Sequence, residues 1–344
     1  MKRIFFLILF IIGLTFNTQS KIRVLTIGIS EYPEKSGWNR LNAANDIDLI
    51  SSLSDNVIVL ENNKATYNEI HKALNILTNK IESGDTVIVH FSGHGQQIVA
   101  NNSKEIDGLD EALIPFDAFK EESSTYKGQN HFRDDDFGTK IETLRAKTGP
   151  SGIVIAVIDA CHSDSMDKDA DEDSQLKYRG TDEIFGTKGL NTREIQELKD
   201  RYFNQEENTI LAKEDKLSDV IFISACGTHQ RNYEIEIGSN SYGSLSYYFY
   251  KSYIEKGFGN LPVFLSYLYD SMTSDKVMKF HGQEPVIRNT IGWQKPNKNP
   301  PPPPDPLETP PGDGLTPLAI IGISLGGLLI ITILLYFLWK QKRK

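Results

Sequence analysis

Three short apolar runs, each followed directly by polar residues, limit most strongly what this chain can fold into. The runs are DTVIVHF, GIVIAVID and DVIFISA, at residues 85–91, 152–159 and 219–225. Short apolar runs of this kind are typical of buried strands in a parallel sheet. Ligands of such sheets bind beyond the carboxyl ends of the strands. We therefore expect a functional site at the segments FSGHG (91–95), DACHS (159–163) and SACGTHQ (224–230).

Strand-like and helix-like segments alternate along residues 21–293. Further strands are predicted at 22–29 and 56–61, and helices at 42–55, 66–83, 244–256 and 261–272. Thr66 and Glu69 form a capping box at the start of one helix. This alternation predicts an α/β domain with a mostly parallel, covered sheet.

Residues 164–216 differ from the rest of the domain, because they are rich in charged residues and poor in apolar runs. This composition predicts a long loop or insertion, disordered in part. For residues 191–203 a solvated surface helix is the alternative.

Both ends of the chain are hydrophobic. Residues 1–20 begin with Lys2 and Arg3, continue as an apolar run and end in small residues. This pattern predicts an export signal that is cleaved near Ser20, with an uncleaved anchor as the alternative. Residues 318–339 carry no charge and are long enough to span a bilayer as a helix. The basic tail KQKRK at 340–344 favours a cytoplasmic C-terminus.

Residues 294–317, just before the predicted span, hold ten of the fifteen prolines in the chain. Such a segment is extended and semi-rigid, so we interpret it as a stalk. The domain at 21–293 is then expected outside the cytoplasm, periplasmic or extracellular, in a single-pass membrane protein. The net charge of −9 argues against nucleic acid as a partner.

Cys161 and Cys226 are the two cysteines of the chain, so at most one disulfide can form. Cys161 is open to three interpretations: a nucleophile, half of a disulfide with Cys226, or a small buried residue. A cysteine nucleophile needs a base and donors for an oxyanion. His94, between two glycines after a strand, is the best candidate base. From spacing alone, a buried cysteine with a structural histidine remains an alternative.

Three blocks of the sequence carry a family resemblance. VIVHFSGHGQQI, DGLDEALIPFD and VIDACHSDS together resemble the metacaspases, which are caspase-like cysteine peptidases. NAANDID, RDDDF, ISACGTHQRNYE, YGSLSYYFY and GQEPVI also occur in the family's order, so the resemblance covers roughly residues 22–290. It implies a caspase-like α/β fold with helices on both sides of the sheet. We also expect a monomeric domain without an organic cofactor.

The resemblance assigns roles to residues at the predicted site. Cys161 matches the nucleophile and His94 the general acid/base, with the backbone N–H groups of Gly95 and Cys161 as the oxyanion hole. Metacaspases cleave after Arg or Lys by means of an acidic pocket, whose positions match Asp46, Ser92 and Asp159. Two carboxylates suit a cation and repel an aspartate side chain.

One position departs from the family pattern. Ala43 stands where many members have cysteine. The pocket can therefore differ in shape, which leaves open a caspase-like peptidase of another specificity.

Calcium is the metal that the resemblance implies. Asp110, Asp134 and Asp135 match family positions near the site, and Asp167 is the nearest acidic residue in the loop after the cysteine. Clustered aspartates suit calcium, which binds six to eight oxygen atoms. The alternative is that the acidic run 134–136 caps a helix.

These observations predict a membrane-anchored cysteine endopeptidase that cleaves proteins or peptides after Arg or Lys. Basic residues after Cys161 are predicted points of self-cleavage, namely Lys168, Lys177, Arg179 and Lys188. A catalytically silent module that displays the same fold on a membrane is the alternative.

Overall fold

The apolar runs of the sequence form the central strands of a six-stranded sheet in the computed structural model, which describes residues 20–100, 108–161, 177–202, 208–227 and 230–296. The strand order is β11-β8-β7-β3-β1-β2. Five strands are parallel and β11 is antiparallel to its neighbour. The strands are β1 (Ile22–Gly28), β2 (Val57–Glu61), β3 (Thr86–Ser92), β7 (Ile153–Asp159), β8 (Asp219–Ser224) and β11 (Val286–Asn289). The predicted α/β architecture with a mostly parallel sheet is confirmed.

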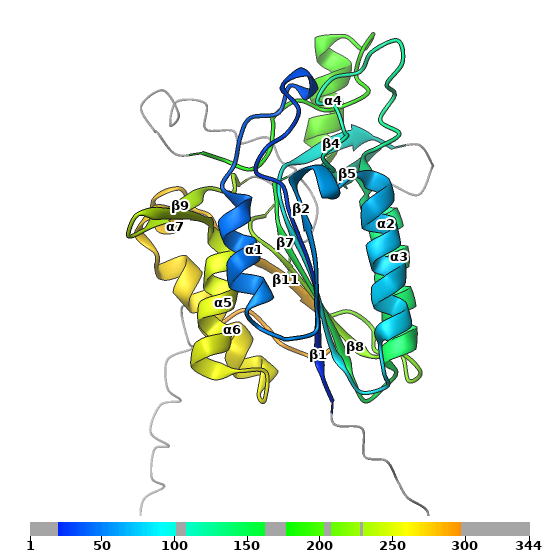
Figure 1. Ribbon diagram of the computed structural model, residues 1–344. Coiled ribbons are helices and arrows are strands. Elements are labelled where there is room, and N and C mark those ends of the chain that lie inside the picture. Colours follow the sequence, from blue (N-terminus) through cyan, green and yellow to red (C-terminus); the bar gives the residue numbers. More distant parts are fainter. Residues whose placement is uncertain (1–19, 101–107, 162–176, 203–207, 228–229, 297–344) are drawn as a thin grey trace, which may run out of the picture. The chain divides into compact units, whose positions relative to one another are not determined.

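Helices cover both faces of this sheet (Figure 1). One face packs against α1 (Ala43–Ser51), α5 (Ser244–Lys256), α6 (Leu261–Ser274) and α7 (Lys276–Phe280). The other face packs against α2 (Tyr67–Lys80) and α3 (Asp134–Thr148). The predicted cap of α2 is present, since the Thr66 hydroxyl accepts a hydrogen bond from the backbone N–H of Glu69 at 3.3 Å.

Smaller elements lie beyond the main sheet. A three-stranded sheet consists of β4 (Gly95–Val99), β5 (Leu109–Leu113) and β6 (Phe132–Arg133), and a hairpin of β9 (Glu234–Ile237) and β10 (Asn240–Gly243). Short 3-10 turns occupy Glu34–Ser36 and Asn62–Lys64, and the remaining helix is α4 (Thr192–Tyr202). The small strands were not predicted, because two to five residues are too few to show a periodic pattern.

Part of the charged region is more buried than expected. Residues 177–187 contain no helix and no extended strand, as expected of a loop, but Arg179 is fully buried. Phe185 is 4% exposed and packs in an apolar cluster with Trp38 and Ile98. Helix α4 agrees with the alternative expected for residues 191–203, a helix on the surface. Residues 162–176 and 203–207 are outside the described part of the chain.

The terminal segments are almost wholly outside the described residues. This applies to the predicted signal (1–20) except for Ser20, to the stalk (294–317) beyond residue 296, to the span (318–339) and to the tail (340–344). Within the described ranges, every helix is too short or too polar to cross a bilayer. The domain boundaries at these ends stay predictions.

Candidate active site

The three residues predicted to form the acidic pocket come together at the ends of the central strands. Ser92 and Asp159 are the last residues of β3 and β7 and pair in register. Asp46 lies in the first turn of α1, and its Oδ2 accepts a hydrogen bond from the Ser92 hydroxyl at 2.7 Å. All three residues are fully buried. The parallel strands explain this meeting, since their carboxyl ends share one edge of the sheet.

The side chain of Arg179 lies among these three residues. Its Nη2 is 2.9 Å from Asp46 Oδ2, and its Nη1 is 3.7 Å from Asp159 Oδ1. Nη1 also donates a hydrogen bond to the Ser92 hydroxyl. Burial alone would lower the pKa of Arg179, but the surrounding carboxylates raise it above its usual value. The guanidinium therefore stays charged without contact with water.

A third carboxylate, from Glu234, was not predicted. Its Oε1 is 3.0 Å from Arg179 Nη2, and the backbone N–H of Asn42 donates to the same oxygen at 2.7 Å. Glu234 begins β9 and is 4% exposed. We name the set Asp46, Ser92, Asp159 and Glu234 the acidic pocket. Its oxygens lie around both terminal nitrogens of the guanidinium, the type of fork that arginine forms and lysine cannot.

The acidic pocket holds three carboxylates and one guanidinium. Burial raises the pKa of Asp46 to about 6, against the lowering effect of Arg179, and the charge of Asp159 raises it further. Three buried carboxylates surround one guanidinium.

Gly243 forms a wall of the acidic pocket. Its backbone N–H donates to Asp46 Oδ1 at 2.9 Å. A Cβ atom at this position would overlap Asp159 Oδ2 and lie 2.6 Å from Nη1 of Arg179. Because the φ of Gly243 is −63°, the backbone itself would accept an alanine. The space that the Asp159 carboxylate and the Arg179 guanidinium occupy requires glycine here.

The backbone around Arg179 lies between Cys161 and residues 232–234, with an antiparallel bridge between Tyr178 and Tyr233. The Cys161 N–H donates to the carbonyl oxygen of Arg179 at 2.7 Å. The Arg179 N–H donates to Asn232 O, and the Glu234 N–H donates to Lys177 O, both at 2.9 Å.

The peptide bond between Arg179 and Gly180 consequently lies at Cys161. A Cβ atom on Gly180 would be 2.5 Å from the carbonyl oxygen of Cys161 and 3.1 Å from its Cβ. The chain is thus in close contact with the cysteine on both sides of this bond.

His94 follows β3 and is 2% exposed. Its Nε2 lies 2.9 Å from the carbonyl oxygen of Asn39. A carbonyl can only accept, so we assign the ring hydrogen to Nε2, which leaves a lone pair on Nδ1. Nδ1 has no hydrogen-bond partner among the residues that the structure describes. Burial lowers the pKa of His94 to about 4, so the ring is neutral at pH 7 and can act as a base.

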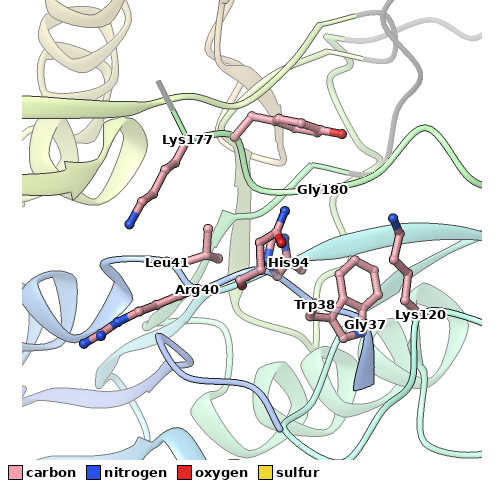
Figure 2. Close-up of a pocket in the computed structure, with 10 residues that line it drawn as sticks. Gly37, Trp38, Arg40, Leu41, His94, Lys120, Lys177 and Gly180 are labelled. Atoms are coloured by element: carbon pink, nitrogen blue, oxygen red, sulfur yellow. The ribbon is translucent and has the colours of Figure 1, made fainter. Parts of the chain in front are cut away.

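Aromatic rings hold His94 in place. The Trp38 ring stacks on it with a centroid distance of 4.9 Å and an interplanar angle of 24°. Figure 2 shows His94 in a cavity that is lined by the loop 37–41, Lys120 and the segment around Gly180. The volume of this cavity is about 320 Å³. The predicted base and the predicted nucleophile therefore adjoin the same segment of chain. Gly95, the other predicted oxyanion donor, begins β4 directly after His94.

Both cysteines are free thiols, so this structure contains no Cys161–Cys226 disulfide. The Cys161 thiol donates to the carbonyl oxygen of Gln230 at 3.2 Å. A side-chain hydrogen bond with Cys161, together with burial, raises the pKa of Cys226 well above its usual range. Cys226 is thus the protonated neighbour of Cys161.

The described residues do not assemble a calcium site. The buried Asp110 forms an ion pair with Arg133. Asp134 and Asp135 lie in the first turn of α3 and line a separate cavity of about 420 Å³. No cluster of three His, Cys, Asp or Glu side chains suited to a metal occurs in the described ranges. Asp167 is outside them, so calcium stays a prediction, which activity in chelator against a calcium titration would check.

Similarity to known proteins extends over the described domain. A family model described as caspase domain matches residues 21–288. Metacaspase-2 of Arabidopsis thaliana is 32% identical over 102 residues, which cover 29% of this chain and 22% of the relative. Metacaspase-1 of Mycosarcoma maydis is 27% identical over 159 residues, 42% of this chain and 36% of the relative. The aligned parts thus span about a third or less of these curated relatives' length.

A solved structure resembles the fold as a whole. The crystal structure of protein GSU0716 from Geobacter sulfurreducens matches with a TM-score of 0.51 and 20% identity. The match covers 80% of this chain and 95% of that one. At this identity the likeness concerns the fold alone.

Proposed function

The chain belongs to the caspase-domain family, and from this premise we propose that it is a cysteine endopeptidase that hydrolyses peptide bonds after arginine or lysine. One observation carries the proposal. The chain's own Arg179 occupies the acidic pocket while its carbonyl oxygen accepts a hydrogen bond from the Cys161 N–H. A substrate arginine held in the same way would have its carbonyl group next to Cys161.

The proposed reaction begins when Nδ1 of His94 takes the proton of the Cys161 thiol. The thiolate attacks the carbonyl carbon, and the Cys161 N–H, with Gly95 as the proposed second donor, stabilises the negative oxygen. His94 then gives its proton to the leaving amine, and a thioester remains. Water, deprotonated by His94, hydrolyses the thioester and restores the thiol. The carbonyl of Asn39 holds the ring by its Nε2–H throughout.

The uncut chain occupies its own site, so we propose that the enzyme matures by cleaving the Arg179–Gly180 bond. Of the four predicted points of self-cleavage, Lys168 is outside the described residues. Lys177 points its backbone carbonyl at β9, and Lys188 lies beyond the buried Phe185. Arg179 alone of the described three has its side chain in the acidic pocket.

The full chain is expected to yield a fragment that begins at Gly180. N-terminal sequencing or intact-mass measurement of the purified protein would detect it. Arg179→Ala should remove this cut because the acidic pocket then has no cation to hold. Lys177→Ala and Lys188→Ala are the matched controls and should retain it. An undiminished cut after residue 179 in Arg179→Ala would contradict the proposal.

We further propose that residues 21–317 lie outside the cytoplasm, anchored by the span at 318–339. The support is the charge-free sequence of the span, the basic tail and the leader at 1–20. Protease added to intact cells or spheroplasts should remove the domain and spare the tail. A domain that is protected until lysis would count against this topology.

A further inference from the structure

Arg231 contacts the residue that precedes Arg179. The guanidinium carbon of Arg231 lies 4.8 Å from the centre of the Tyr178 ring, within the range of a cation–π interaction. Arg231 is 6% exposed and Tyr178 is partly buried, so little water separates the two. Burial raises the pKa of Tyr178, which keeps the ring a neutral phenol.

The same guanidinium contacts a residue on the other side of the Arg179–Gly180 bond. Its Nη2 donates a hydrogen bond to Asp182 Oδ2 at 2.9 Å. Asp182 is the third residue after the bond. One side chain therefore touches the bound segment both before and after the bond that lies at Cys161.

The backbone next to Arg231 aligns this segment. Asn232 accepts the N–H of Arg179, and Tyr233 pairs with Tyr178 in an antiparallel bridge. Any peptide that binds along residues 232–234 with an arginine in the acidic pocket places the residue before that arginine next to Arg231. The contact with Tyr178 thus belongs to the binding groove and not only to this segment.

We propose that Arg231 is a specificity-determining residue that selects substrates with an aromatic residue directly before the arginine and a carboxylate three residues after the scissile bond. The inference rests on the proposed function. A planar guanidinium can stack on an aromatic face and also donate an N–H to a carboxylate, and a lysine in its place would do both less well. The aromatic contact is the stronger selector, because Asp182 is more exposed than Arg231.

The test uses the self-cleaved full chain and fluorogenic peptides with the core Lys-Tyr-Arg-Gly-Thr-Asp. In two comparison peptides, phenylalanine or alanine replaces the tyrosine. In a third, asparagine replaces the aspartate. The wild type should cleave the tyrosine and phenylalanine peptides with a kcat/KM about tenfold above that of the alanine peptide. The kcat/KM of the aspartate peptide should be roughly threefold above that of the asparagine peptide.

Arg231→Gln should bring two kcat/KM ratios close to one: that of the tyrosine peptide to the alanine peptide, and that of the aspartate peptide to the asparagine peptide. Arg231→Lys, the second variant, should reduce the first of these ratios. Arg193→Gln, which changes an exposed arginine on α4, is the matched control and should keep the wild-type ratios. Equal cleavage of the tyrosine and alanine peptides by the wild type would overturn the inference, as would ratios that survive in both Arg231 variants. A wild type that cleaves no peptide after a basic residue refutes the proposed function instead, which is a different result.

Discussion

Cys161→Ala is expected to reduce cleavage of arginine peptides by at least about 10⁴-fold and to leave the Arg179–Gly180 bond intact, since the proposed reaction has no other nucleophile. His94→Ala should reduce cleavage of arginine peptides by nearly as much, because the thiol then has no base to take its proton. The double variant should be little worse than either single one, as two groups that act as a unit are not additive. Steady-state kinetics on the purified protein would measure all three.

Cys226→Ala is the matched control for the nucleophile. It removes the other buried thiol at the site and leaves Cys161 and His94 in place, so peptidase activity should persist. Substantial activity in Cys161→Ala would refute the assignment of the nucleophile. A wild type that is inactive on every peptide would favour the alternative of a catalytically silent binding module.

Gly243→Ala is expected to lower kcat/KM for arginine peptides by more than about 100-fold, because the added methyl group takes the space of the guanidinium and disturbs Asp159. The same change should prevent self-cleavage after Arg179. The backbone conformation at Gly243 suits alanine, so the effect should appear in substrate binding with the fold retained.

Gly259→Ala is the control for this substitution. A Cβ atom there meets nothing within 4 Å, so activity and thermal stability should match the wild type. Normal cleavage of arginine peptides by Gly243→Ala would show that substrates do not use the acidic pocket.

The fold was predictable because its signals are local. Five of the six strands of the main sheet and the helices α1, α2, α5 and α6 were located from apolar runs, helical spacing and a capping box. The edge of the sheet that carries the site could also be predicted, because the carboxyl ends of parallel strands lie together and bring Ser92 next to Asp159. The resemblance to metacaspases added Asp46, which periodicity alone would place on a solvated helix surface.

The tertiary structure decided what occupies the acidic pocket. A charged segment without apolar periodicity indicates a loop, so the burial of Arg179 could not be foreseen. Burying one guanidinium is costly unless carboxylates and hydrogen bonds surround it. Here they come from α1, β7 and β9, elements that are far apart in the sequence. Glu234 and Gly243 were missed for the same reason, since each acts only through a contact that folding creates.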